Sequence, residues 1–161
     1  SNYNRAQTEA AVRVFRELHT PFLLNQVCYN LLNRTIEEDG LKALAAQEGF
    51  GIIAYSPLAQ GLLTQRYANG IPEDSRINKS GTLRKETLTP ALFAKLAKLN
   101  DLAKSRNQTL PAFALSWVLK DPEMTSVIIG ASSSAQILEN IQVNPVFSSE
   151  EVAAIEAICR E

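Results

Sequence analysis

The sequence contains few of the side chains from which metal sites and disulfide frameworks are built. It has one histidine, and its two cysteines, Cys28 and Cys159, lack the spacing of a disulfide framework or a metal site. It also lacks an apolar run of membrane length and a recognisable signal peptide. The formal net charge is −1, so no field favours nucleic acid or an anionic membrane. We therefore expect a cytoplasmic protein that binds no nucleic acid, membrane or metal.

The composition is typical of one folded domain. The chain has 161 residues, of which 45% are hydrophobic, and this is enough to bury a sizeable core. We find no internal repeat, low-complexity tract or interdomain linker. Residues 1–161 are therefore expected to form a single unit.

The hydrophobic pattern predicts alternating helices and buried strands. Helical spacing or helix-start signals occur at residues 5–18, 35–48, 90–106, 110–119, 132–143 and from 149 onward. Short apolar segments predict strands at 22–27, 50–54 and 126–129. Between the last two strands, residues 55–89 form a long loop with a helical turn near 61–67, and loops of this length are usually functional or mobile. The alternation indicates the α/β class, with a parallel sheet covered by helices.

Particular residues predict where the helices begin and end. Pro21 stops the first helix and Gly49 closes the second, while Thr35 before two glutamates predicts a capped start. Pro90 occupies the first position of another helix, and Ser148 opens a capping box for the last.

Two strand ends have the composition of a ligand site. Residues 54–63 read AYSPLAQGLL and residues 127–134 read VIIGASSS, and each run leads from an apolar strand into a polar loop. Parallel α/β folds bind their ligands at such strand ends. An ordinary strand exit is the alternative explanation of the first run.

The motifs along the chain also resemble a known family. They are SNY at 1–3, NQ at 25–26, YNLLNR at 29–34, the run 55–63, GIP at 70–72, DSR at 74–76, ALSW at 114–117 and residues 129–140. In this order they resemble the C-terminal half of the aldo-keto reductases, in the group that includes bacterial L-glyceraldehyde 3-phosphate reductases and potassium channel β-subunits. The resemblance implies the C-terminal part of a (β/α)8 TIM barrel, with three strands and, at residues 1–3, the end of a fourth. A complete barrel takes about 250 residues, so we expect a truncated piece of one.

The resemblance implies an NADP-dependent reduction of small aldehydes or ketones to alcohols, with this segment supplying most of the dinucleotide site. NADP is favoured and NAD is the alternative, because many members place a basic residue where Ala131, Ser133 and Gln136 stand here. The basic loop at 76–85 is another source of charge, or simply a solvated loop. The sequence has no glycine-rich Rossmann fingerprint, so we expect the extended binding mode of a barrel. The alternative function is a cofactor-binding or regulatory module, or an inactive fragment, without turnover.

The resemblance assigns the cofactor contacts to three groups of residues. Amide and hydroxyl groups can pin a carboxamide, an aromatic ring can stack on nicotinamide, and a serine cluster at a helix start can bind an anion. Turn chemistry and strand-end capping are the alternative explanation of the amides. The implied contacts are Ser1, Asn2, Gln26 and Tyr55 for nicotinamide; Ser56, Pro57, Leu58, Gln60 and Gly61 for pyrophosphate; and Gly130, Ser132, Gln136, Glu139 and Asn140 for adenosine.

No residue of this sequence is assigned a catalytic role. The family's proton donor and its companions lie on the first four βα units, which this sequence does not contain. His19 is expected at a helix C-terminus away from the site, and neither Tyr29 nor Tyr55 is expected to act as an acid. Trp117 and the leucine stripe at 92–102 are expected to pack in the core.

The expected topology implies a partner. A piece of a barrel exposes unpaired strand edges and apolar faces, which recruit partners or aggregate. We expect the chain either to associate with itself or to be completed by a missing N-terminal half.

Overall fold

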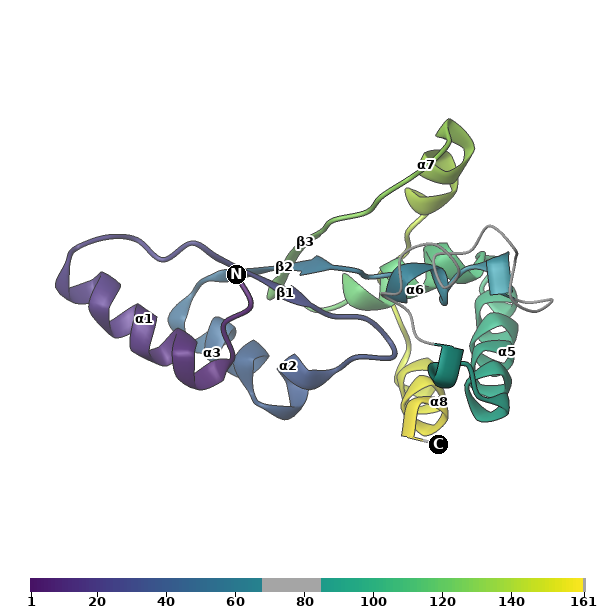
Figure 1. Cartoon of the computed structure of the whole chain (residues 1–161), viewed down its shortest axis with the longest axis horizontal. Coiled ribbons are helices and arrows are strands. Elements are labelled where there is room, and N and C mark those ends of the chain that lie inside the picture. Colours follow the sequence, from purple (N-terminus) through teal and green to yellow (C-terminus); the bar gives the residue numbers. More distant parts are fainter. Residues whose placement is uncertain (68–84, 161) are drawn as a thin grey trace.

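The computed structural model describes residues 1–67 and 85–160, and it has an open α/β architecture (Figure 1). Three parallel strands lie side by side in the order β1-β2-β3. The strands are β1 (Leu24–Cys28), β2 (Gly51–Tyr55) and β3 (Met124–Val127). The helices are α1 (Arg5–Glu17), α2 (Thr35–Glu38), α3 (Leu41–Glu48), α5 (Pro90–Ser105), α6 (Leu110–Val118), α7 (Ser134–Asn140) and α8 (Ser149–Arg160), with short 3-10 turns η1 (Ala59–Gly61), η2 (Gln65–Tyr67) and η3 (Lys85–Thr87).

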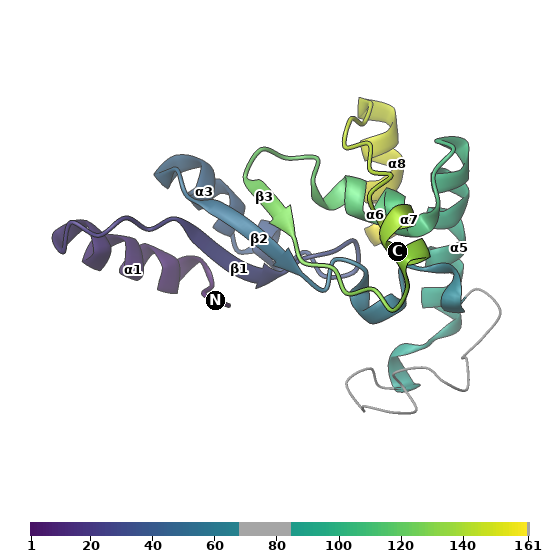
Figure 2. The same ribbon diagram turned by 90° about the horizontal axis from the view of Figure 1, so that it is seen from above.

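The helices gather at two ends of the sheet. Figures 1 and 2 both show α1 and α3 toward one end and α5, α6 and α8 toward the other. Two extended segments carry α7 away from the sheet in Figure 1. The core lies between the sheet and the helices, and its largest fully buried side chains include Trp117, Tyr29, Phe113, Ile52 and Leu99.

The predicted helix ends are largely confirmed by hydrogen bonds. The Thr89 hydroxyl accepts from the backbone N–H of Leu92 at 3.1 Å, and this caps the helix in which Pro90 is the first residue. The backbone N–H of Ser148 donates to Glu151 at 2.7 Å and that of Glu151 donates to Ser148 Oγ at 3.2 Å, so the capping box is present. Gly49 ends α3 with a φ of 75°.

The single helix predicted at 35–48 is wrong, because the segment forms two helices. Gly40 adopts a φ of 78° between them, a conformation open to glycine, and the Asp39 carboxylate accepts from Leu41 N–H at 2.9 Å. The predicted cap at Thr35 is wrong as well. Thr35 is the first helical residue, and its hydroxyl donates to Asn33 Oδ1 at 3.1 Å.

Two strands are displaced from their predicted positions. β1 spans Leu24–Cys28 instead of 22–27, and β3 spans Met124–Val127 instead of 126–129. Hydrogen bonding to β2 determines where both strands begin and end. Of β1 only Asn25 and Val27 are buried, since one face of this edge strand is covered by helices and the other is open. The helix predicted at 132–143 is shortened to Ser134–Asn140.

Core packing confirms the roles predicted for Trp117 and for the leucine stripe. Trp117 is 0% exposed, and its ring lies 5.2 Å from that of Tyr29. Leu96 and Leu99 of the stripe are buried, while Leu92 and Leu102 pack partly against the same core. His19 is exposed and follows α1, as predicted.

Large apolar side chains are exposed on both sides of the sheet. We call the first group, which lies on α1 and β1 and their flanks, the β1-side surface; it consists of Tyr3, Val14, Leu18, Leu23 and Leu24. The second group follows β3 and is called the β3-side surface; it consists of Ile128, Ile137, Leu138, Ile141, Val143 and Val146. Such concentrations of exposed apolar side chains mark interaction surfaces.

Within residues 1–67 and 85–160, no helix is both long and apolar enough to cross a membrane. Nor do these residues contain a group of three His, Cys, Asp or Glu side chains placed to hold a metal ion. The GIP and DSR motifs and nearly all of the basic loop at 76–85 fall outside the described residues.

Candidate functional site

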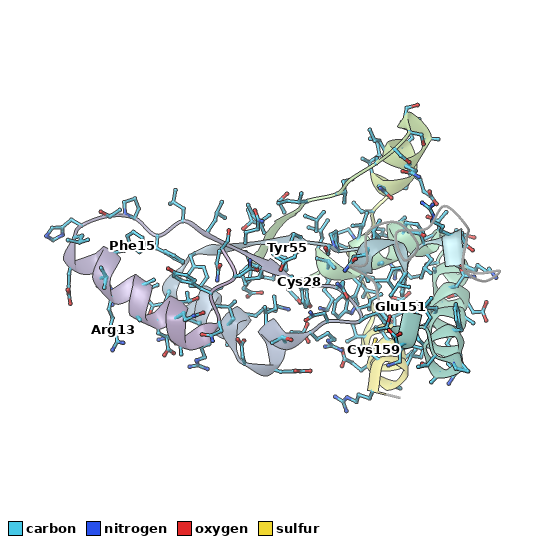
Figure 3. The ribbon with its side chains drawn as sticks, viewed as in Figure 1. Arg13, Phe15, Cys28, Tyr55, Glu151 and Cys159 are labelled. Carbon is cyan, nitrogen blue, oxygen red and sulfur yellow. The ribbon has the colours of Figure 1, made fainter. Side chains whose placement is uncertain are left out.

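The carboxyl ends of the three strands meet at one edge of the sheet. Cys28 pairs with Tyr55, and Ala54 pairs with Val127. The segments that follow the strands, including 56–61 and 128–133, therefore start from the same edge. Figure 3 shows Cys28 and Tyr55 on the two neighbouring strand ends. This edge is where a parallel α/β sheet binds its ligands.

The residues predicted to contact nicotinamide lie around this edge. The backbone N–H of Asn2 donates to the Gln26 carbonyl at 2.7 Å, so the N-terminal segment runs beside β1. The Asn25 side chain donates to the Tyr3 carbonyl at 2.9 Å and fixes the same segment. Ser1 and Asn2 are exposed, and Asn2 has a φ of 59°.

Gln26 and Tyr55 share the open face of the sheet. Successive side chains of a strand point to opposite faces, and paired residues of parallel strands point to the same face. Asn25, Val27, Ile52 and Ala54 are buried against the helices, so Gln26 and Tyr55 face the other way. Both side chains are half-buried there.

The loop after β2 has an unusual backbone. Ser56, Ala59 and Gln60 have φ values of 51°, 48° and 57°, and Gly61 has a φ of 100°. Left-handed conformations are costly for residues other than glycine, and they concentrate at binding sites. The Asn30 side chain holds this loop by donating to the Ser56 carbonyl at 2.9 Å.

Gly61 lies at the end of this loop. Its N–H donates to the Leu58 carbonyl at 2.9 Å and closes the turn. Its φ of 100° is the reason for glycine here. Pro57 is buried, and Leu58 and Gln60 are half-buried.

The segment after β3 brings Ser132 and Gln136 together. Gln136 Oε1 accepts from the N–H and the hydroxyl of Ser132 at 2.8 and 3.2 Å. Ser133 caps α7 by accepting from the Gln136 N–H at 3.3 Å. Gly130 is exposed, Glu139 is half-buried and Asn140 is only 6% exposed.

A network of charged side chains around α2 and α3 was not predicted from the sequence. Tyr29 donates to Glu37, which also pairs with Arg34, and Lys42 lies 2.5 Å from Asp121. Lys42 and Asp121 are 79 positions apart, so no local signal could have identified the pair between them. The network joins α2 and α3 to the segment before β3.

The tyrosine of this network is buried, and its hydroxyl hydrogen is directed to Glu37 and not to a ligand. Tyr29 is 0% exposed, and burial together with its bond to Glu37 raises its pKa far above the ordinary value. Burial also raises the pKa of Glu37, but hydrogen bonds from Tyr29 and Arg34 outweigh it and lower that pKa overall. The carboxylate thus stays ionised and the phenol stays neutral, which is the state of a structural network.

Neither thiol is activated. Burial raises the pKa of both Cys28 and Cys159. A nucleophilic cysteine requires a lowered thiol pKa and access to solvent. Cysteine-based nucleophilic chemistry is therefore not supported by these two residues.

Comparison with known proteins identifies the family of this chain. The sequence model described as "Aldo/keto reductase family" matches residues 1–160. The chain belongs to the aldo/keto reductase family. It is 44% identical over 162 residues to an L-glyceraldehyde 3-phosphate reductase of Escherichia coli K12, a match that covers 97% of this chain and 47% of the relative. It is 34% identical over 142 residues to a probable voltage-gated potassium channel subunit beta of Oryza sativa subsp. japonica, a match that covers 84% of this chain and 43% of the relative.

Solved structures confirm the fold class of this aldo/keto reductase chain. A glycerol dehydrogenase from Gluconobacter oxydans superposes with a TM-score of 0.77 at 26% identity, over 98% of this chain and 46% of that one. A thermostable aldo-keto reductase crystallised with the inhibitor epalrestat superposes with a TM-score of 0.68 at 22% identity, over 98% of this chain and 46% of that one. At this identity the match is evidence for the fold only. The sheet is thus part of a TIM barrel. The chain spans about half the length of the curated relatives it matches.

Proposed function

We propose that this chain supplies the dinucleotide site of an NADP-dependent aldo-keto reductase, which reduces small aldehydes or ketones to alcohols in the cytoplasm. The observation that carries the proposal is the position of Gln26 and Tyr55. They share the open face at the carboxyl end of the sheet, with Asn2 bonded to the backbone of Gln26. The 44% identity to a reductase over nearly the whole chain supports the reaction class.

The nicotinamide end fits the side chains at this edge. Nicotinamide, when bound, supplies the hydride. The Gln26 amide both donates and accepts, as a carboxamide requires, and Ser1 and Asn2 are exposed beside it. The half-buried Tyr55 ring stacks on one face of the nicotinamide and leaves the other free for hydride transfer.

The rest of the dinucleotide is proposed to follow the two strand exits. Ser56, Pro57, Leu58, Gln60 and Gly61 contact the pyrophosphate, and the left-handed backbone of this loop is the supporting observation. Gly130, Ser132, Gln136, Glu139 and Asn140 receive the adenosine end. The bonded pair Ser132 and Gln136 presents hydroxyl and amide groups there.

Reduction of a carbonyl also requires a proton for the oxygen. Tyr29 is sealed in its network, and neither thiol is activated. We propose that the proton donor and the substrate-binding loops belong to the other half of the barrel. This chain alone is then expected to show no oxidation of NADPH by methylglyoxal above background.

The two exposed apolar surfaces are proposed to contact that other half. The β1-side and β3-side surfaces flank the two edge strands, where further βα units of a barrel would pack. Sedimentation combined with intact mass is expected to show a self-associated chain or a longer polypeptide. A monodisperse 17.7 kDa species with a cooperative melting transition would contradict this part of the proposal.

Titration with NADPH tests the site directly. Tyr55→Phe keeps the ring and is expected to keep the affinity. Tyr55→Ala removes the stack, which is worth about 0.5–1.5 kcal/mol, and is expected to weaken binding about two- to tenfold. Equal affinities for both variants, or no binding of NADPH or NADH by the parent chain, would count against the proposal.

A dinucleotide-binding module without turnover is the second candidate. The similarity to a probable voltage-gated potassium channel subunit beta favours it. An in-frame coding sequence upstream of Ser1 would indicate the reductase if it encodes further βα units that carry a tyrosine and a lysine. NADPH binding without turnover by the whole protein would indicate the module.

A further inference from the structure

The connection between α7 and α8, residues 141–148, is held by a buried arginine. Arg106 follows α5, and its side chain is 9% exposed. Its guanidinium donates to the Asn144 carbonyl at 3.0 Å, to the Val146 carbonyl at 2.9 Å and to Glu151 at 2.6 Å. It also lies 4.1 Å from the centre of the Phe147 ring.

A buried serine on α6 holds the same connection from the other side. Ser116 Oγ accepts from the backbone N–H of Asn144 at 2.8 Å and from the Gln108 side chain at 2.9 Å. It donates to the Ala112 carbonyl at 2.6 Å, so its bonding capacity is used. The Gln108 side chain also donates to the Gln142 carbonyl at 3.3 Å.

α7 itself has little burial to hold it in place. Its side chains at 134–138 are exposed, and Asn140 is its buried residue. Figure 1 shows it carried away from the sheet by its two flanking segments. One of these is fixed to β2, where Ile128 N–H donates to the Ala54 carbonyl at 2.8 Å. The other is the connection held by Arg106 and Ser116.

We infer that Arg106 and Ser116 are positioning residues for the adenosine end of the dinucleotide site, which they place by fixing the connection after α7. The inference rests on the proposed function, because it takes Ser132, Gln136 and Glu139 to be the adenosine contacts. Neither Arg106 nor Ser116 needs to touch the cofactor. Loosening the connection lets α7 move relative to the strand ends, so the adenosine end loses affinity while the nicotinamide end does not.

Binding of two half-cofactors to the full chain tests this. Adenosine 2′,5′-bisphosphate probes one end and nicotinamide mononucleotide the other. Arg106→Gln is expected to weaken the bisphosphate about tenfold and to change the mononucleotide less than twofold. Arg106→Lys keeps the positive charge near Glu151 but loses the several N–H donors of the guanidinium. Its affinity for the bisphosphate is expected to lie between those of the parent and Arg106→Gln. Arg16→Gln is the matched control, because Arg16 is 69% exposed and joins α1 to Glu48 of α3, the two helices that lie toward the other end of the sheet (Figure 1).

Hydrogen exchange supplies a readout that does not depend on the cofactor. In Arg106→Gln and in the milder Ser116→Ala, amides of residues 134–147 are expected to exchange at least several times faster, with α1 and α3 unchanged. If the parent chain binds neither half-cofactor but the variants exchange faster than the parent, the proposed function fails. The claim that Arg106 and Ser116 fix the connection after α7 is then still supported. Unchanged exchange in both folded variants, or equal loss of both half-cofactors, would overturn the inference.

Discussion

Replacing Gln60 by glycine is expected to stabilise the fold and weaken cofactor binding at the same time. Gln60 adopts a φ of 57° and a ψ of 24°, inside the left-handed region. This conformation costs an L-residue about 1–2 kcal/mol. Glycine adopts it freely but loses about 0.5–1 kcal/mol through the greater freedom of the unfolded chain. The net gain lies between about 0 and about 1.5 kcal/mol, or up to roughly 6 °C in melting temperature for a chain of this length.

The loss of affinity follows from the proposed contact of the Gln60 side chain with the pyrophosphate. A neutral hydrogen bond is worth about 0.5–1.5 kcal/mol, so NADPH binding is expected to weaken about two- to tenfold. Thermal unfolding and NADPH titration of the same preparation measure the two effects. Opposite signs are typical of a residue kept in a strained conformation for function.

Asn107→Gly is the matched control. Asn107 has a φ of 54° at the end of α5, outside the proposed site. It should gain stability, although less than Gln60→Gly because asparagine tolerates this conformation, and its NADPH affinity should not change. The reasoning is refuted if Gln60→Gly loses stability, or if both variants bind NADPH equally well.

Three further predictions concern the core, the charged network and the cofactor. Trp117 is fully buried, and its indole N–H has no hydrogen-bond partner among residues 1–67 and 85–160. In urea titrations Trp117→Phe should therefore cost less than about 2 kcal/mol of unfolding free energy, and Trp117→Ala about 3–5 kcal/mol. The folded-state pKa values of Glu37 and Asp121 are lowered against the opposing effect of burial, so their stabilisation is present above the unfolded pKa values and is lost as the pH falls through the folded ones. Urea unfolding between about pH 5 and pH 2 should show this loss, and it should be smaller in Glu37→Gln. In the whole protein, Gln136→Arg should favour NADP over NAD by roughly 1–3 kcal/mol through a charge-assisted bond, measured by parallel titrations, and an unchanged ratio would place the 2′-phosphate elsewhere.

Local signals located the helices well because caps act over three or four residues. Thr89 with Pro90, and Ser148 with Glu151, form the bonds that their spacing predicts. Gly40 shows the limit of such signals, because a glycine inside a helical pattern can be tolerated or can break it. Strand boundaries depended on pairing with β2, which no single segment encodes.

The candidate site was predicted by motif and refined by geometry. The positions of Gln26 and Tyr55 on one face follow from strand alternation and could have been predicted. The left-handed conformations of Ser56, Ala59 and Gln60 could not, because these residue types do not prefer them. The role of Arg106 was equally hidden, since its acceptors lie 38 and 40 positions away.

The order of the strands also has a kinetic consequence. Leu24 pairs with Gly51, about 27 positions later, whereas Ile52 pairs with Met124, about 72 positions later. Closing the longer loop costs about 0.9 kcal/mol more chain entropy than closing the shorter one. The unit of β1, α3 and β2 is therefore expected to form first and to act as the template on which β3 docks. Pulse-labelled amides in β1 and β2 should become protected before those of β3, and simultaneous protection would indicate that the three strands condense in one step.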